Sequence, residues 1–429
     1  MLSVLSNSWA LLLGMFLLMI GNGLQGTLLG VRGEIEGFST AEMSIVMSAY
    51  FAGFLGGSRL APEMIRRVGH VRVFAALASM VSAVLILFPV FTDPWLWTIG
   101  RLLVGFCLSG VYVTAESWLN NAATNQNRGQ TLSAYMIVQV VGIITAQGLL
   151  VVADPSGFVL FVIPSVLVSI SFAPILLSIS PTPAFDTAKP MTLRALYGVS
   201  PLGVMGMLLL GSVFAAQFGM SAVYGAAAGL SLGQISVFAA MFFVGSLVVQ
   251  YPLGWLSDRM DRRLLILVCS AVGAVGAALG YASGQVFEVL LVAAFVIGGV
   301  SNPLYSLLIA YTNDFLQPED MASASGGLLF INGLGAIAGP VVTGQIMRIQ
   351  GPAGFFVVIA FFFAALSIYA AYRMTQRPTP ATEDAASYAP VGPTSTPVAV
   401  EFAQEYAIEV QAEEETAAAD ARGPTSDAA

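Results

Sequence analysis

Long apolar segments follow one another along the chain with only short polar interruptions. Most are about 20 residues long or longer, the length at which a helix crosses the hydrocarbon core of a bilayer. They fall into two sets of six, separated by a proline-containing stretch. We expect helices at 8–30, 42–62, 71–91, 95–119, 130–152 and 156–179, and again at 199–224, 234–256, 263–284, 286–312, 322–347 and 352–373. The pattern predicts an all-α polytopic membrane protein with twelve transmembrane helices.

Composition supports this fold class and excludes several functions. Of the 429 residues, 57% are hydrophobic and only 9% are charged, whereas soluble domains carry about 25% charged residues. A soluble enzyme, a nucleic-acid binder and a secreted disulfide scaffold are therefore excluded. The single histidine excludes a multi-histidine metal or haem site, and the two cysteines lie in apolar runs and imply no disulfide. No G-x-x-x-x-G-K-[ST] pattern is present, so we expect no ATP hydrolysis and no cofactor.

The distribution of Lys and Arg predicts the orientation of the chain. If both termini lie in the cytoplasm, the inner loops and the end of the last helix carry most of these residues, and only Arg32 and Arg348 fall in outer loops. Short cytoplasmic loops are enriched in Lys and Arg. We therefore expect an integral protein of the inner (plasma) membrane with both termini cytoplasmic.

Four regions are expected along the chain. Residues 1–180 form an N-terminal six-helix bundle, 181–198 a cytoplasmic linker, and 199–373 a C-terminal six-helix bundle. Residues 374–429 are rich in proline and acidic residues and are expected to be a disordered cytoplasmic tail. Within it, Phe402, Tyr406 and Val410 recur at i+4, so residues 400–415 could form a transient helix.

The two halves repeat one another in sequence. An offset of 192 residues aligns Gly53 with Gly245 and Gln25 with Gln217, and an offset of 193 aligns Gly105 with Gly298. The register drifts by one residue over more than 100, which indicates duplication. Six spans per half give both copies the same orientation, as in transporters built from two parallel halves, whose site lies between the halves.

The strongest motif, residues 254–263, reads Gly-Trp-Leu-Ser-Asp-Arg-Met-Asp-Arg-Arg. It resembles the G-x-L-[AS]-D-R-x-G-R-R pattern of the major facilitator superfamily, with Asp261 in place of the usual glycine. The resemblance implies a twelve-helix transporter whose inner loops form charged contacts that make and break. An alternative is a simple positive-inside anchor. The equivalent first-half loop has Arg66 where the motif has Asp258, and Glu63 could substitute for that aspartate. The expected inner-gate residues are Arg67, Gly254, Asp258, Arg259 and Arg262.

The segment 95–119 carries the charges that matter most. Arg101 and Gly105 resemble the superfamily's R-x-x-x-G signature, and Tyr112 and Glu116 share their helical face. A charge inside a span is costly, so it normally faces the bundle interior. Arg101 could bind an anionic group, pair with a protonatable partner or serve helix packing. Glu116 could carry a coupling proton or form an ion pair with Arg67 or Arg72.

Two short segments narrow the resemblance. Ala115-Glu-Ser-Trp-Leu-Asn120, together with Arg66-Arg-Val-Gly-His70, resembles the YcaD-like branch of the superfamily. This implies no defined substrate. We interpret His70 as a solvated loop residue, and the Gly335-x-x-x-Gly339-Pro340 element as helix packing.

Polar residues within apolar segments are the candidates for lining a cavity. They are Asn22, Gln25, Tyr112, Gln139, Gln217, Tyr224, Asn302, Tyr305 and Asn332. With one buried acid and one buried base, the site suits a small neutral, amphipathic or singly charged organic solute. We predict a monomeric secondary transporter that works by alternating access, with a proton gradient as its energy source. A facilitative uniporter or an exporter of the same fold is the alternative, and a membrane-embedded enzyme or a channel is disfavoured because spans lack clustered His, Asp or Glu.

Overall fold

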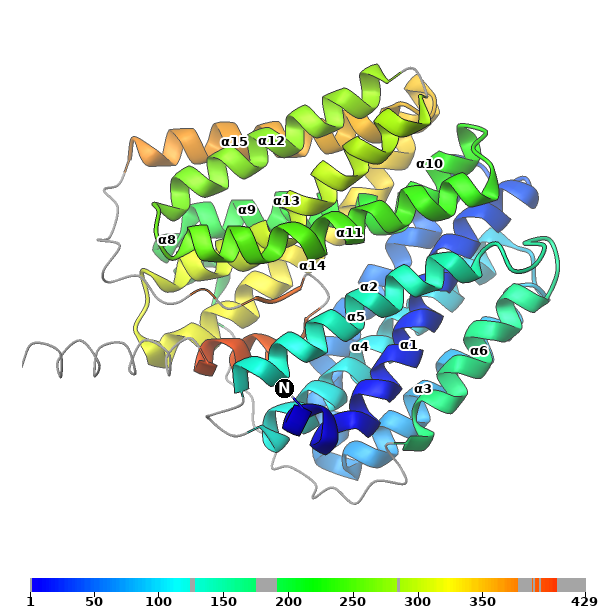
Figure 1. The fold of residues 1–429 in the computed structure, drawn as a ribbon, viewed down its shortest axis with the longest axis horizontal. Coiled ribbons are helices and arrows are strands. Elements are labelled where there is room, and N and C mark those ends of the chain that lie inside the picture. The colour runs from blue at the N-terminus through cyan, green and yellow to red at the C-terminus, as the bar shows by residue number, and fades with distance from the viewer. Residues whose placement is uncertain are drawn as a thin grey trace, which may run out of the picture.

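The computed structural model describes residues 2–123, 128–174, 191–283, 286–376, 388, 390–392 and 395–406, without the side chains of residues 2–8, 121–122 and 318. Each of the twelve segments predicted to be helical contains a helix within the described residues (Figure 1). The first half contains α1 (Leu2–Ile35), α2 (Thr40–Val68), α3 (His70–Leu87), α4 (Pro94–Ala122), α5 (Arg128–Leu149) and α6 (Val159–Ser171). A short helix, α8 (Leu193–Val199), lies in the expected linker, of which residues 181–190 are outside the described residues.

The second half begins with a span that changes its helical type. It runs through α9 (Pro201–Ala215), a π-helical turn η1 (Ala216–Met220) and α10 (Ser221–Ala227). The other helices are α11 (Leu232–Ser257), α12 (Arg262–Ala282), α13 (Phe287–Asn313), α14 (Pro318–Gln350) and α15 (Gly354–Met374).

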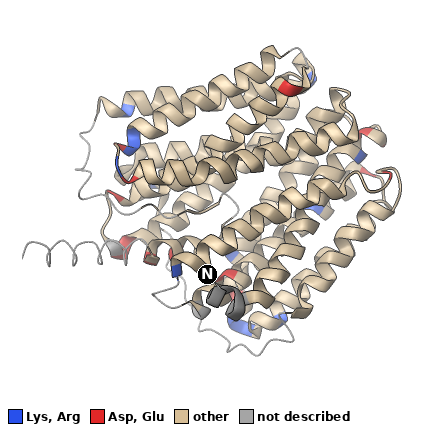
Figure 2. Ribbon diagram, viewed as in Figure 1, with Lys and Arg blue, Asp and Glu red and all other residues tan. Residues whose placement is uncertain are grey.

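Ten helices in the described part of the chain are long and apolar enough to cross a membrane. The two that fall outside this set are α2, whose serine, glycine and charged residues lower its mean hydropathy, and α6, whose described helix has 13 residues. Both pack within the first bundle like their neighbours. Charged residues gather near the helix ends and leave the central parts almost free of charge (Figure 2). The expected fold class, an all-α polytopic membrane protein, is confirmed.

The two halves have the same internal packing. In the first, α2 packs on α4, α1 on α5 and α6, and α3 on α4 and α6. In the second, α11 packs on α13, the α9 segment on α14 and α15, and α12 on α13 and α15. Helix by helix these are the same pairs, as expected of a duplicated six-helix unit.

Glycines at equivalent positions allow the tightest of these contacts. A Cβ atom at Gly53 would overlap the Leu102 carbonyl, and one at its equivalent, Gly245, would overlap the Phe295 carbonyl. Only glycine lets the two backbones come this close. The Gly335 element packs in the same way, because a Cβ there would overlap the backbone of Leu208, in agreement with the packing role expected for it.

Each half also begins its second helix with the same turn. Gly37 and Gly229 have φ values of 78° and 75°, a left-handed conformation that favours glycine. Two residues later, Ser39 and Ser231 form capping boxes with Glu42 and Gln234. The reciprocal bonds satisfy free N–H groups of the first turn, so the duplicated sequence specifies the same helix start in both halves.

The tail differs from its expected disorder. Residues 388, 390–392 and 395–406 lie against the bundle, and 397–406 form a helix, drawn in red in Figure 1. Val391, Val400 and Phe402 are at most 2% exposed. For this segment the prediction of disorder is wrong, because a short apolar stretch within a polar, Pro-rich region finds a partner surface. The rest of residues 377–429 lies outside the described residues, including the second part of the predicted 400–415 helix.

Candidate functional site

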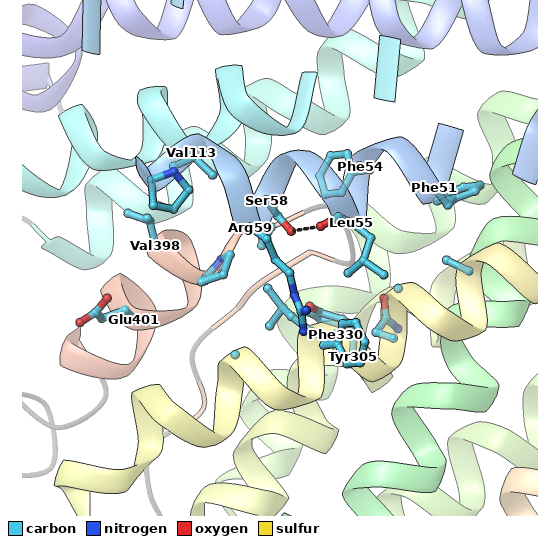
Figure 3. A pocket seen from close by; sticks show the side chains of 18 of the residues that line it. Phe51, Phe54, Leu55, Ser58, Arg59, Val113, Tyr305, Phe330, Val398 and Glu401 are labelled. Carbon is cyan, nitrogen blue, oxygen red and sulfur yellow. Dashed lines mark hydrogen bonds between the residues drawn. The ribbon is translucent and has the colours of Figure 1, made fainter. Parts of the chain in front are cut away.

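Two cavities open between the halves at the end of the molecule where the tail segment lies. Cavity 1, of about 510 Å³, lies between α2 and α14 and is lined by Tyr50, Phe54, Arg59, Tyr305 and Asn332 among others (Figure 3). Cavity 2, of about 580 Å³, lies between α5 and α11. Residues of both halves and of the tail line each cavity, and those lining cavity 2 include Asn22, Tyr112, Gln139, Asn302, Gly254, Asp258 and Arg259.

The opposite end of the bundle is closed by direct contact between the halves. A Cβ at Gly30 of α1 would come within 2.7 Å of Ala222 Cβ in α10, and Gly344 of α14 packs on Ser44 of α2. Ser48 Oγ donates to the Ile337 carbonyl at 2.6 Å. Small residues therefore close this end among the described residues, and the two cavities between the halves lie toward the tail end.

A buried polar network fills the interior of the first half. Asn22 Nδ2 donates to the hydroxyls of Tyr112 (3.0 Å) and Tyr50 (3.3 Å), and Asn22 Oδ1 accepts from Gln25 Nε2 (3.2 Å). Gln25 Oε1 in turn accepts from Arg101 Nη1 at 2.8 Å. The network joins α1, α2 and α4. It reaches cavity 2 through Asn22 and Tyr112, and cavity 1 through Tyr50.

Arg101 is fully buried behind this network. Its guanidinium lies 4.6 Å from the centre of the Tyr50 ring, an arrangement in which the ring's negative face attracts the cation. Among the described residues no carboxylate pairs with it, and its Nε atom has no hydrogen-bond partner. The side chain is thus held by a carbonyl oxygen and a ring, and it lines neither cavity.

Glu116 is bound by neutral groups. Its Oε1 accepts from the Tyr135 hydroxyl at 2.9 Å, and its Oε2 accepts from the backbone N–H of Thr396 at 3.3 Å and from the Thr396 hydroxyl. The expected ion pair with Arg67 or Arg72 is absent among the described contacts. Arg67 instead pairs with Glu63 at 2.7 Å on the exposed end of α2, and Arg66 pairs with Glu63 as well. Glu116 lies in the bundle interior, out of reach of that exposed end.

His70 is buried, and the prediction of a solvated loop residue is wrong. It is 1% exposed, its Nε2 lies 2.9 Å from Ser117 Oγ, and its ring stacks on Trp118 at 6.0 Å. The neighbouring arginines suggested a polar loop, but α3 begins at this residue and turns the ring toward α4.

The second half supplies amide and hydroxyl groups. Gln217 lies in the π-helical turn, where its Oε1 accepts from Ser301 Oγ at 3.1 Å and its Nε2 has no partner among the described residues. The Tyr305 hydroxyl also lacks a partner there. Asn332 Nδ2 donates to the Met207 carbonyl at 3.1 Å. Irregular π turns are frequent at functional sites. Tyr224, by contrast, packs on Phe355 and Phe356 and lines neither cavity.

An aromatic cluster lies where the halves meet, and the sequence analysis did not identify it. Phe218 of η1 packs against Tyr50 and Phe51 of α2, with ring centres 6.0 and 6.3 Å apart, and against Phe214 and Phe243. With 27 phenylalanines in the chain, aromatic residues alone gave no signal. These rings form apolar walls for both cavities.

The motif loop between α11 and α12 binds within its own half. Arg262 pairs with Asp314 at the end of α13 and lies 3.7 Å from Asp258. Asp261 caps the start of α12 by accepting from Arg263 N–H at 2.9 Å. Arg259 lies 4.4 Å from the Trp255 ring centre. The described charged pairs of this loop join α11, α12 and α13 and do not cross to the other half.

Of the predicted site residues, the structure brings one group directly to the cavities and keeps the other behind their walls. Tyr112 and Gln139 line cavity 2, and Tyr305 and Asn332 line cavity 1. Gln25, Arg101, Glu116 and Gln217 lie behind the walls. Gln25 and Arg101 belong to the interior network, Glu116 binds the tail, and Gln217 binds Ser301 of α13.

Comparison with known proteins agrees with this architecture. The family model described as Major Facilitator Superfamily matches residues 11–231 and 202–404. The chain is 26% identical over 354 residues to an uncharacterized MFS-type transporter YcaD of Escherichia fergusonii, covering 82% of this chain and 91% of the relative. An uncharacterized MFS-type transporter of Enterobacter sp. is 26% identical over 376 residues, covering 86% and 96%.

A solved structure shows the same fold. A crystal structure of a mutant of the nucleoside transporter NupG superposes with a TM-score of 0.72 at 16% identity, covering 86% of this chain and 99% of that one. At this identity the match concerns the fold alone, whereas the family model covers most of the chain. The chain belongs to the major facilitator superfamily, and it is a membrane transporter rather than an enzyme.

Proposed function

We propose that this protein is a proton-coupled secondary transporter that carries a small organic solute across the inner membrane by alternating access. One observation supports this above all others: the space between the halves is lined from both of them and opens at one end only. Rocking of the two bundles, residues 1–180 and 199–373, would expose that space to each side in turn. The protein acts as a monomer on this proposal, because one chain supplies both halves of the site.

The open end is the cytoplasmic one on this proposal. Arg59 and Arg66 line cavity 1 near its mouth, and Arg259 lines cavity 2. These residues belong to the loops and helix ends whose excess of arginine indicates the cytoplasmic side. Both termini then lie in the cytoplasm, and the closed end faces outward.

The cavity walls favour a neutral or singly charged solute with an apolar or aromatic part. Phe51, Phe54, Phe214 and Phe218 contribute apolar walls, and amides and phenols lie beside them, whereas the charged lining residues belong to the helix ends, the motif loop and the tail. Tyr305 supplies a free hydroxyl, and Arg101 is a buried cation without a carboxylate partner among the described residues. Nucleosides fit this description, and the fold neighbour NupG is a nucleoside transporter.

Glu116 is our candidate for the coupling proton. It is 2% exposed, and its described partners are hydroxyl and backbone groups rather than a cation. A carboxyl group that moves between dry and wet surroundings changes its proton affinity. Glu116 is bound on one side by Thr396 of the tail, so movement at this end would change its access to water. A uniporter would use the same cavities without this step.

The test begins by finding the solute and then measures coupling. Purified protein is screened for thermal stabilisation by a panel of metabolites and drugs that includes nucleosides. Each stabilising compound is then assayed for uptake into proteoliposomes under an imposed pH gradient of either direction. We expect accumulation above that of protein-free liposomes in one direction. Stabilising compounds that never accumulate under either gradient would contradict coupling, and compounds that do not cross at all would contradict transport.

Tyr305→Phe shows whether the cavity holds the solute. The Tyr305 hydroxyl makes no hydrogen bond in the described structure, so its removal should leave folding intact. A hydroxyl that binds the solute contributes about 1 kcal/mol, or roughly fivefold in affinity. Tyr224→Phe, far from the cavities, is the matched control. Unchanged affinity in Tyr305→Phe would remove this hydroxyl from the binding site.

A further inference from the structure

The described residues of the tail segment 388–406, which are 388, 390–392 and 395–406, lie between the halves at the open end. We propose that the vestibule formed by cavities 1 and 2 is a docking site for this segment of the protein's own tail, and that the docked segment closes the solute path and must leave before transport. The proposal rests on the transport function proposed above.

The first part of the segment binds the second half. The Tyr388 backbone N–H donates to Asp258 Oδ1 at 2.9 Å, and the Tyr388 hydroxyl accepts from Gln250 Nε2 at 2.8 Å. The Tyr388 ring also packs on Gly254, where a Cβ would come within 2.9 Å of it. Further along, the backbone of Val391 exchanges two hydrogen bonds of 2.9 Å with the Ser306 hydroxyl. Two residues of the superfamily motif, Gly254 and Asp258, thus contact the tail.

The next part crosses to the first half. Thr396 donates to Glu116 through its N–H and its hydroxyl. Near the end of the segment, Glu405 pairs with Arg128 at 3.2 Å, and the Arg128 guanidinium lies 5.8 Å from the Phe402 ring centre. The segment therefore connects α4 and α5 to α11 and α13.

The tail helix, residues 397–406, is held by a buried polar anchor and apolar contacts. Gln404 Nε2 donates to the Met321 carbonyl at 3.1 Å and to Ser325 Oγ in α14. Val400 and Phe402 are 0% and 1% exposed. Burial of these apolar side chains favours docking. The tail helix thus places its polar side chain against polar groups and its apolar side chains against apolar ones, as a peptide does in a peptide-binding groove.

The position of the segment makes docking and transport exclusive. Ser395, Pro397 and Val398 line cavity 1, while Tyr388, Val391 and Gly392 line cavity 2, so the chain runs between the two openings. In alternating access the inner ends of the halves must come together. The tail fills the space they would occupy, and it binds Glu116.

The chain length favours the protein's own tail as the occupant. Only 13 residues separate the end of α15 at Met374 from Tyr388. A short tether keeps a segment at an effective concentration in the millimolar range, so an intramolecular segment outcompetes a free peptide of equal affinity.

The experiment measures access to the vestibule without a solute. A single cysteine replaces Ser133, which lines cavity 2, in a chain that also carries Cys107→Ala and Cys269→Ala. The rate of maleimide labelling is measured in the full chain, after removal of residues 378–429, and after removal of residues 407–429 as the matched control. We expect the first truncation to raise the rate at least tenfold and the control to leave it unchanged. A synthetic peptide of residues 388–406 should restore slow labelling.

Val400→Asp gives the same test with the tail present, in case the truncated chain does not fold. A charge at this fully buried position should free the segment and raise the labelling rate. Equal rates in the full chain, the long truncation and Val400→Asp would overturn the docking proposal. If the long truncation or Val400→Asp labels faster but takes up an identified solute at the initial rate of the full chain, the docked segment does not close the solute path. If labelling changes as expected and no solute crosses any variant, docking stands and the proposed transport function fails.

Discussion

The buried pair between Arg262 and Asp314 offers a sharp test of what the motif loop does. Its side chains are 4% and 7% exposed, and Arg262 also lies 3.7 Å from Asp258, whose side chain is 42% exposed. Because α11, α12 and α13 belong to one half, the structure predicts that these charges hold that half together. A gate between the halves would instead use them to control opening.

The burial of each side chain gives the expected loss in the free energy of unfolding. Asp314→Asn removes the closer of the two carboxylates beside the buried Arg262 cation and leaves the half-exposed Asp258 at 3.7 Å, together with the neutral groups of Ser257 and Ala310. Breaking a buried pair in this way costs about 3–5 kcal/mol, and the remaining contact with Asp258 places the loss near 3 kcal/mol. Asp258→Asn removes an exposed charge, which contributes about 1 kcal/mol or less. We therefore expect the two substitutions, both Asp to Asn on the same arginine, to differ about threefold in their cost.

The assay is thermal unfolding of purified protein, with maleimide labelling at Ser133→Cys as the report of conformation. If the C-terminal half unfolds as a unit, 3 kcal/mol lowers the midpoint by roughly 6 °C or more. Asp314→Asn should show this shift and label at the rate of the unsubstituted chain. If Asp314→Asn unfolds at the normal temperature but changes the labelling rate, the pair does not hold the C-terminal half together and instead acts as a gate. Equal losses in Asp314→Asn and Asp258→Asn would refute the argument from burial.

Three further expectations can be tested on the same preparations. Glu116→Gln should abolish accumulation driven by a pH gradient while solute exchange continues, and full accumulation in proteoliposomes would remove Glu116 from coupling. Gly298→Ala should lower the folded yield seen by size exclusion, because its Cβ would overlap the backbone of the opposing helix, whereas Gly233→Ala, with nothing within 4 Å, should not; equal yields would contradict the packing argument. Tyr388→Phe removes the acceptor for Gln250 and should speed labelling of the vestibule roughly fivefold, the equivalent of about 1 kcal/mol, and an unchanged rate would show that this bond does not hold the tail.

The fold could be predicted in detail because its determinants are local and repeated. Apolar runs long enough to span a bilayer specify the helices, and the offset between the halves aligned the glycines at which helices meet. Gly53 and Gly245 illustrate this, since their equivalence in sequence became the same close contact in both halves. The π turn at Ala216–Met220 could not be foreseen, because its residues fit an ordinary helix pattern equally well.

The sequence predicted which residues lie in the site, but it did not predict which groups they contact. Tyr112, Gln139, Tyr305 and Asn332 were identified as polar groups in apolar spans, and they line the cavities. The partner of Glu116 was not, because Thr396 is 280 positions away in a segment whose composition indicated disorder. Composition averages over a window, whereas docking depends on a few apolar side chains that match a surface formed elsewhere in the chain.

The contacts between the halves at one end of the molecule differ in kind from the contacts of the tail at the other, and this difference favours the tail as the removable part. The closed end depends on backbones that meet at Gly30 and Gly344, so opening it requires whole helices to move. The vestibule end is open, and a tethered peptide lies across it whose polar contacts can be exchanged for water as it leaves. Its release would uncover Glu116 and Asp258 together, one a candidate proton site and the other part of the motif loop. On our proposals, solute entry, protonation of Glu116 and closure of the inner ends therefore share one preceding step, the departure of residues 388–406.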